Sequence, residues 1–227
     1  MRILAFESSA VGASVAFCRD EVLVASAFQA SGLTHSRTLL PMAQSLLENA
    51  GLTMEEVDVL AVAHGPGSFT GLRIGVSLVK GLAFERNLPC IGVSTLEALA
   101  NCMPRCDAVL CAVMDARAGQ VYHANFDLAG EIPMRLCEDR AITVAELREE
   151  LALLDRPVQL AGDGAHLLAD IGEQMPGNLR LQNAYGVARL AARIYEAGGD
   201  FSASALRPEY LRLPQAERER LAKLRKE

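Results

Sequence analysis

A strand-to-helix turn rich in glycine, residues 64–75 (HGPGSFTGLRIG), constrains the fold of this chain more than any other stretch. The apolar residues 57–63 before it have the length and the β-branched content of a buried strand. Apolar side chains in residues 72–84 after it recur at helical spacing. A buried strand that leads directly into a helix is typical of α/β layer folds, so the turn predicts that class.

The same turn is a candidate anion site, because a helix N-terminus offers free amides and the positive end of the helix dipole. Gly65, Gly67 and Ser68 are the residues placed to contact such an anion. The turn lacks the lysine of a Walker loop and the spacing of a dinucleotide-binding fingerprint. The competing interpretation, which we favour, is close packing. Gly71 and Gly75 lie one helical turn apart, and glycine inside a helix costs about 1 kcal/mol relative to alanine.

Length and composition are those of a globular chain with one large domain or two small ones. Of its 227 residues, 51% are hydrophobic and 22% are charged. No apolar run approaches the length of a membrane helix and the first residues do not resemble a signal peptide, so we expect a cytoplasmic protein. The six cysteines show no C-x-x-C pair or disulfide spacing, which predicts reduced thiols. A formal net charge of −6 argues against broad nucleic-acid binding by this chain alone.

The pattern before the turn predicts a strand meander followed by one helix. Apolar runs at residues 2–9, 13–18 and 22–28, separated by short turn signals, predict three antiparallel strands. Residues 35–50 carry apolar side chains at helical spacing, and Gly51 can supply the left-handed position after the helix. This helix is apolar around more of its girth than a single core needs, which predicts a second packing partner.

The pattern after the turn repeats the one before it. Ser94 and Glu97 have the spacing of a capping box for a helix. Residues 107–115 then form a buried-type strand that ends in an acid, as residues 2–7 do. Further strands are expected at residues 120–126 and 157–161, and further helices from Thr143, from Ala165 and over residues 184–197. The repetition predicts a duplicated domain. The expected parts are subdomains 1–104 and 105–206 and a basic strand or helix tail, 207–227.

Several short stretches together resemble one family, the TsaB (YeaZ) subunits of bacterial threonylcarbamoyladenosine synthesis on tRNA. They are residues 3–10, 14–16, 65–75, 92–96, 115–117 and 210–212, with His35, Leu40-Pro41 and Val121-Tyr122. The likeness runs over nearly the whole chain, and the glycine-rich block is its most specific part. It implies an actin/sugar-kinase/Hsp70-like fold of two similar subdomains, with mixed sheets flanked by helices.

The resemblance also implies a noncatalytic role. Such a subunit binds and activates the related transferase TsaD as a heterodimer, and the ATPase TsaE joins them. ATP is used by the complex, this chain has no cofactor of its own, and tRNA is bound only through the complex. Whether the chain forms a homodimer when it is alone is left undecided. The predicted interface side chains are Leu39, Leu40, Met42, Ala43, Leu46 and Leu47 on the first helix and Gly71, Leu72, Gly75, Val79 and Leu82 on the second.

The metal chemistry of the related transferase is not expected here. In the transferase two histidines hold a metal, and that motif falls on residues 93–99 of this chain. Thr95 and Leu99 occupy the two ligand positions, and a leucine side chain has no atom that ligates a metal. No two of the four histidines lie at i and i+4. We therefore predict no metal site and no catalytic residue.

The main alternative is a small ATP-binding or ATP-hydrolysing enzyme of the same fold. Glu7, Ser8 and Asp115 would then address phosphate and Mg²⁺ from the two subdomains. We favour the competing interpretation, in which both acids are satisfied by main-chain amides, because family members commonly carry the shorter aspartate at the first position. A peptidase built on Ser68 and His64 lacks an orienting acid. Contact of the basic tail with tRNA is a further, weaker alternative.

Overall fold

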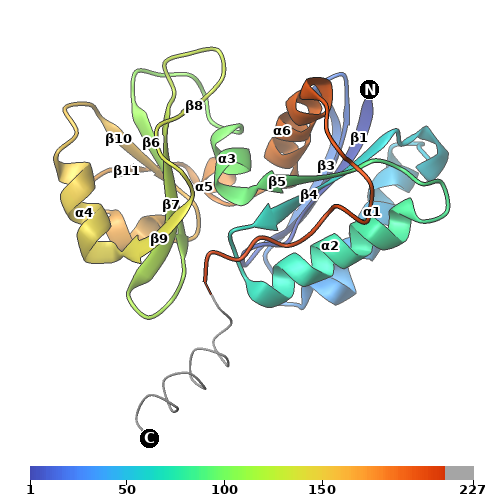
Figure 1. Cartoon of the computed structure of the whole chain (residues 1–227), viewed down its shortest axis with the longest axis horizontal. Helices are drawn as coiled ribbons and strands as arrows, with labels where there is room; N and C mark the ends of the chain where they lie inside the picture. The colour runs from blue at the N-terminus through green and yellow to red at the C-terminus, as the bar shows by residue number, and fades with distance from the viewer. Residues whose placement is uncertain (213–227) are drawn as a thin grey trace, which may run out of the picture.

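The computed structural model describes residues 1–212 (Figure 1), and the predicted tail helix lies in residues 213–227, outside the described residues. The chain forms two sheets side by side, each flanked by helices. The first has five strands in the order β3-β2-β1-β4-β5. The second has six, in the order β11-β10-β6-β7-β8, with β9 also paired to β7. The predicted α/β class with mixed sheets is confirmed.

The first sheet joins an antiparallel meander to two parallel strands. The meander is β1 (Arg2–Glu7), β2 (Ala13–Arg19) and β3 (Val22–Gln29), and the parallel strands are β4 (Val59–Gly65) and β5 (Cys90–Ser94). Strand β2 pairs antiparallel with both β1 and β3, so the predicted meander is confirmed. Strand β1 also pairs parallel with β4. Side chains alternate between the two faces of a strand. Leu4 and Phe6 therefore enter one core, and Ile3 and Ala5 enter the other.

Three long helices cover the first sheet. Helices α1 (His35–Asn49) and α2 (Phe69–Ala83) lie on one face, with the short η1 (Met54–Glu56) between them in the chain. Helix α6 (Ala184–Ala197) covers the opposite face and packs on β1, β2, β4 and β5. It belongs to the predicted part 105–206, which therefore contributes one helix to the first half of the molecule.

The second half repeats the beginning of the first with shorter helices. Its elements are β6 (Val109–Asp115), β7 (Gln120–Asp127), β8 (Met134–Arg135), β9 (Arg140–Thr143), α4 (Val144–Ala152), β10 (Val158–Ala161), η2 (Ala165–Leu168), β11 (Glu173–Gln174) and α5 (Gly177–Arg180). Strand β6 pairs antiparallel with β7 and parallel with β10, as β1 does with β2 and β4. The predicted helix from Ala165 is a single 3-10 turn. The predicted helix from Thr143 is present as α4, and Thr143 and Glu146 form a capping box at its start.

Helix α3 (Thr95–Ala100) lies between the two sheets and packs on both. Leu96 and Leu99 join Leu110 and Phe126 of the second sheet in one buried cluster. The Ser94 hydroxyl accepts from the Glu97 amide, as predicted, at 3.2 Å. The Glu97 carboxylate does not reach back to complete the capping box. It accepts instead from Arg135 Nη2 at 2.7 Å, because that arginine supplies a charged donor from the second half.

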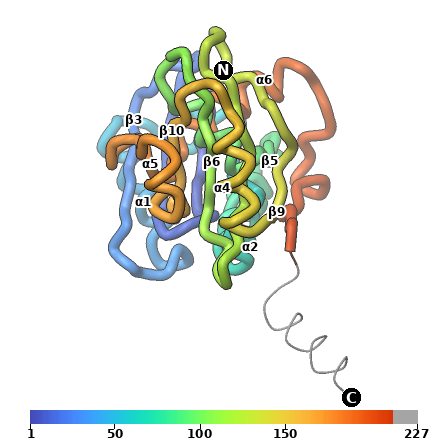
Figure 2. The backbone as a smooth tube through the Cα atoms, turned by 90° about the vertical axis from the view of Figure 1, so that its left-hand side faces the viewer, coloured from blue at the N-terminus to red at the C-terminus, as the bar shows by residue number. Residues whose placement is uncertain are grey.

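When the molecule is turned by 90° about the vertical axis of Figure 1, the segment after α6 is seen to run down one side (Figure 2). The described chain ends on that side, at about the height of α2 in this view. Among the described residues, no helix combines the length and the apolar composition needed to cross a bilayer.

Candidate functional site

The glycines of the predicted stripe on α2 pack against the turn that follows β1. A Cβ placed on Gly71 would lie 2.0 Å from the Ser8 carbonyl oxygen, and one on Gly75 would lie 2.4 Å from Ser8 Oγ. A Cβ on Gly67 would lie 2.6 Å from the Ser9 carbonyl oxygen. The Ser8 hydroxyl in turn donates to the Gly71 carbonyl at 2.9 Å. The stripe thus packs the helix on its own sheet, as the packing interpretation predicts.

Gly65 has a different neighbour, the segment near the end of the described chain. Its φ is +149°, a conformation that favours glycine, and an added Cβ would lie 2.2 Å from the Glu209 carbonyl oxygen. The Glu209 amide donates to the His64 carbonyl at 2.7 Å. The end of β4 therefore holds a strap of chain that comes from beyond α6.

The amides at the start of α2 are partly used within the chain. The Ser68 hydroxyl caps the helix by accepting from the Gly71 amide at 3.3 Å. The Ser68 amide itself donates to the Ser9 carbonyl at 2.7 Å. The contacts at this turn are therefore those of packing. The anion role predicted for Gly65, Gly67 and Ser68 stays a prediction, with one of its amides already occupied.

Most side chains predicted to meet a partner are covered by the chain's own first sheet. The buried ones are Leu39, Ala43, Leu46 and Leu47 on α1 and Gly71, Leu72, Gly75 and Val79 on α2. Five of them, Leu39, Ala43, Leu46, Leu47 and Val79, belong to the core between these helices and the sheet. Little surface of the eight is left for a partner, so the fold does not support their assignment to an interface, which stays a prediction. The physical reason is that a stripe at helical spacing marks a buried face without saying which surface buries it. Leu40, Met42 and Leu82 keep part of their surface exposed.

The exposed side chains of α1 and α2 line a groove of about 570 Å³ between the two helices, called here the α1–α2 groove. Its apolar walls are formed by Leu40 on α1 and by Phe69, Ile74 and Leu78 on α2, with Arg73 beside them. Of the residues that line the groove, sequence reasoning named Leu40 and the buried Leu39 as interface residues. The signal for the others was present, because Ile74 and Leu78 are apolar residues one turn apart that lie off the glycine stripe.

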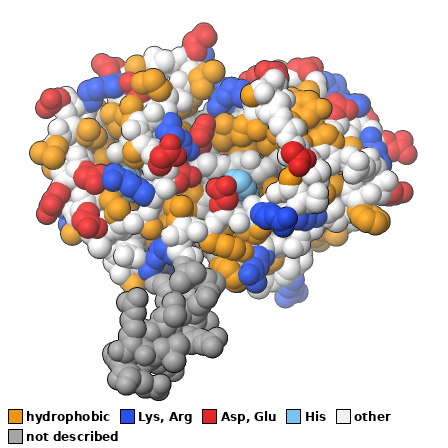
Figure 3. Space-filling view, viewed as in Figure 1, with side chains coloured by type: hydrophobic (Ala, Val, Ile, Leu, Met, Phe, Trp, Pro, Cys, Tyr) orange, Lys and Arg blue, Asp and Glu red, His pale blue; other side chains and the backbone are white. Residues whose placement is uncertain are grey.

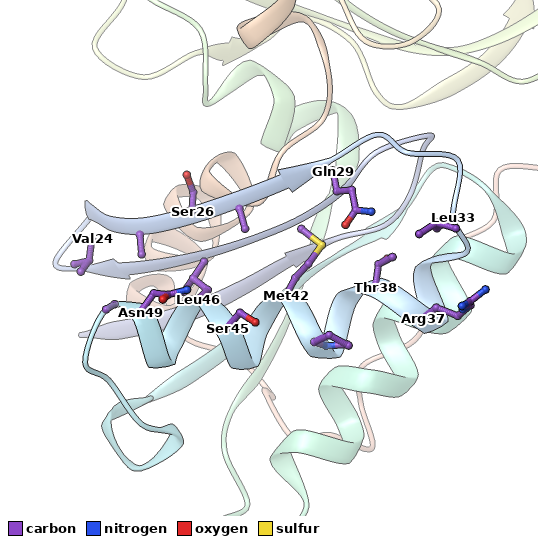
Figure 4. Close-up of a pocket in the computed structure, with 14 residues that line it drawn as sticks. Val24, Ser26, Gln29, Leu33, Arg37, Thr38, Met42, Ser45, Leu46 and Asn49 are labelled. Atoms are coloured by element: carbon purple, nitrogen blue, oxygen red, sulfur yellow. The ribbon is translucent and has the colours of Figure 1, made fainter.

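A second groove, of about 610 Å³, lies on the other side of α1, against the edge strand β3 (Figure 4). Met42 and Leu46 point from α1 toward the sheet, and Val24 lies at one end. The side chains of Ser26, Gln29, Ser45 and Asn49 add polar atoms to its rim. Leu40 and Met42, predicted together as interface residues, therefore line two different grooves.

Acidic side chains of the two halves approach each other where β1 and β6 end. Glu7 is 1% exposed and accepts from the Ser9 amide at 2.5 Å. Burial raises the pKa of Glu7 to about 7; hydrogen bonds from Ser9 oppose the rise, and the charge of Asp163 adds to it. Asp115 is exposed and accepts from the Arg117 amide at 2.7 Å. Both predicted phosphate-facing acids thus bond main-chain amides, the arrangement that the favoured interpretation expects.

Asp163, which sequence reasoning treated only as part of a turn, is the second half's partly buried acid at this junction. Burial raises its pKa, the charge of Asp115 adds to the rise, and a hydrogen bond from Gln182 at 3.1 Å opposes it. The signal in the sequence was its place between two glycines after a strand. Among residues 1–212, no three His, Cys, Asp or Glu side chains converge in a metal-binding arrangement. The motif positions Thr95 and Leu99 are both 1% exposed.

Charges of both signs are spread over the face shown in Figure 3. Lys and Arg side chains alternate with Asp and Glu side chains over both halves, with hydrophobic side chains between them. This face of the described chain therefore lacks the continuous basic surface on which nonspecific nucleic-acid binding depends.

Comparison with known proteins connects this geometry to tRNA modification. The family model of TsaD, tRNA N6-adenosine threonylcarbamoyltransferase, matches residues 29–197. The tRNA threonylcarbamoyladenosine biosynthesis protein TsaB of Escherichia coli (strain K12) is 31% identical to this chain over 220 residues, which cover 93% of this chain and 95% of that protein.

Solved structures agree on the fold. A crystal structure of a Pseudomonas aeruginosa protein with similarity to peptidase YeaZ has a TM-score of 0.76 at 28% identity, covering 93% of this chain and 99% of that one. The ethanolamine utilization protein EutJ from Carboxydothermus hydrogenoformans, at 11% identity, has a TM-score of 0.51 and covers 83% of this chain and 89% of that one. The second likeness concerns the fold alone. The predicted actin/sugar-kinase/Hsp70-like fold is confirmed.

Proposed function

Because the chain belongs to the TsaB (YeaZ) family of tRNA threonylcarbamoyladenosine biosynthesis proteins, we propose that it is a noncatalytic subunit that binds and activates the transferase TsaD. In this proposal the ATPase TsaE joins the pair in the cytoplasm, and tRNA is held by the complex. The complex transfers the threonylcarbamoyl group to the adenosine next to the anticodon. A homodimer of this chain would use the same surface when TsaD is absent.

The observation that carries the proposal is the α1–α2 groove. Exposed apolar surface between two helices is costly in water and is typical of a site that receives another helix. The groove has about 570 Å³ of space and apolar walls on both sides. Leu40 is 39% exposed there although it lies on a helix whose other apolar side chains are largely buried. A helix pair from a partner would bury these walls and complete a helix bundle.

The junction between the two halves supports a noncatalytic role over the alternative of an ATP-hydrolysing enzyme. The Mg²⁺ that accompanies the phosphates of ATP needs ionised carboxylates with free oxygen lone pairs. Glu7 is buried and has a pKa of about 7, so a large share of it is neutral at physiological pH. Asp163 already accepts from Gln182. The acids at this junction are thus arranged to bond the chain itself.

Size-exclusion chromatography with light scattering tests the proposal on the whole chain, alone and mixed with TsaD of the same organism. We expect a new heteromeric peak. Modification of tRNA should require this chain together with TsaD, TsaE, ATP and threonylcarbamoyl-adenylate. A chain that never joins TsaD would contradict the proposal, and ATP turnover by the chain alone would establish the enzyme alternative.

A further inference from the structure

The segment that follows α6 is bound to the first half along its length. It crosses the open edge of β5, where the Cys90 amide donates to the Phe201 carbonyl at 2.7 Å, and continues past β4 toward α2 (Figure 1). Leu206 is buried in the core beneath α1 and α2. Nδ1 of His64 lies 3.1 Å from the Arg207 carbonyl oxygen, and the Glu209 amide bonds the His64 carbonyl. We call residues 206–212 the C-terminal clasp.

Tyr210 of the clasp holds two side chains of the α1–α2 groove. Its ring packs on Phe69 with the centroids 4.7 Å apart. Its hydroxyl accepts from Arg73 Nε at 3.0 Å. The Arg73 guanidinium also lies 3.8 Å from the centre of the Phe69 ring, a cation–π contact. Phe69 and Arg73 both line the groove, so Tyr210 fixes the position of its end wall.

Arg212 ties the same clasp to the second half. Its Nη1 atom donates to the Ala116 carbonyl at 2.8 Å. Ala116 lies in the turn between β6 and β7, where Arg117 and Ala118 have φ of 62° and 53°. Residues 210–212 therefore contact two other stretches that sequence analysis singled out, residues 65–75 and residues 115–117. The packing of α2 on its sheet and the apolar walls of the groove do not by themselves explain why Tyr210 bonds Arg73 and Arg212 bonds Ala116.

We propose that Tyr210 and Arg212 are positioning residues for the partner groove: the clasp holds Phe69 and Arg73 in the arrangement that the partner contacts. The inference rests on the proposed function, which makes the groove the TsaD site. An arginine and an aromatic ring at the rim would otherwise sample many rotamers and lose that freedom on binding. Holding them in place beforehand lowers the entropic cost of binding. Arg212 sets the end of the clasp against the second half.

The test compares Tyr210→Ala with Tyr210→Phe and with a control, Tyr195→Ala. Tyr195 is 38% exposed, close to the 39% of Tyr210. Its ring stacks on Phe201 with the centroids 5.4 Å apart, so both alanine variants lose a comparable aromatic pair. The Kd for TsaD is measured by calorimetric titration of each full-length variant. We expect Tyr210→Ala to raise the Kd about tenfold, while Tyr210→Phe, which keeps the ring, and Tyr195→Ala stay within about twofold.

Amide hydrogen exchange of the chain alone provides a second reading that does not depend on the partner. Tyr210→Ala should speed exchange at Glu209 and in residues 69–74, and Tyr195→Ala should leave those residues unchanged. If Tyr210→Ala does not fold, Arg212→Ala replaces it, with the same expected direction in both measurements.

The two readings separate the inference from the proposed function. A Tyr210→Ala variant that binds TsaD as tightly as the wild type would overturn the inference and leave the proposed function standing. A wild-type chain that binds no TsaD would end the proposed function. In that case unchanged exchange in residues 69–74 would overturn the clasp as well, and faster exchange would retain it as a device that shapes the groove.

Discussion

The two faces of α2 differ in what they contact. The inner face carries Gly71 and Gly75 and presses on the turn after β1, with no room for a side chain. The outer face carries Ile74 and Leu78 and lines an open groove. Gly75 and Ile74 are neighbours in the chain, yet one is buried and the other meets the groove. A stripe of small residues here marks the chain's own sheet, and apolar residues off that stripe mark the surface left for a partner.

The largest effect is expected on the inner face. Gly71→Ala would place a methyl group 2.0 Å from the Ser8 carbonyl oxygen, which is main chain and can move away only by shifting the turn. We predict a loss of about 3 kcal/mol in the free energy of unfolding, measured by urea denaturation. Gly81→Ala is the matched control, because a Cβ there has nothing within 4 Å. It should gain up to about 1 kcal/mol from helix propensity.

If Gly71→Ala were as stable as the wild type, the contact of α2 with the β1 turn would be wrong. The face with Gly71 and Gly75 would then again be a candidate for the partner interface, and the two faces of α2 would no longer differ in what they contact.

The turn beneath the inner face should make stability depend on pH. Glu7, next to Ser8, has its pKa raised to about 7 from 4.5, so the folded state binds its proton more tightly than the unfolded state does. The stabilisation is complete below pH 4.5 and is lost as the pH rises through 7. We expect the wild type to lose about 2 kcal/mol between pH 5 and pH 8 relative to Glu7→Gln.

The Gln variant keeps an oxygen that can accept from the Ser9 amide. Denaturation curves of both proteins at several pH values give the unfolding free energy of each as a function of pH. If the two free energies changed with pH in the same way, Glu7 would not be the cause of the pH dependence. Because Glu7 takes no part in the groove, tRNA modification by the complex should stay near the wild-type level.

A smaller effect is expected at the end of α2 that both faces share. Ser68→Ala removes the hydroxyl that accepts from the Gly71 amide, and helix caps of this kind contribute about 1 kcal/mol. Thermal unfolding followed by circular dichroism measures the change. TsaD binding should be retained, because Ser68 does not line the groove. Loss of activity without loss of stability would instead revive a catalytic or anion-binding role for this serine.

Local patterns predicted the elements well and their partners poorly. The predicted helix 184–197 has those bounds in the structure, since Asn183 caps its start and Gly198 follows its end. Its docking on the first sheet was not predictable, because an amphipathic stripe does not specify which sheet covers it. The partners of Glu97 and Asp163 come from segments far away in the chain. The clasp contact of Tyr210 depends on the whole path after α6, which no local spacing records.

The affinity of outer-face variants for TsaD tests the central claim most directly. Ile74→Glu puts a charge on the apolar wall of the groove, and Ser77→Arg fills the groove from an exposed position while keeping every apolar side chain. Leu153→Glu, 82% exposed beyond α4, is the control. We predict that both groove variants raise the Kd about a hundredfold, with unfolding free energies within about 1 kcal/mol of the wild type, and that the control binds normally. Groove variants that bind TsaD as tightly as the control does would contradict the account.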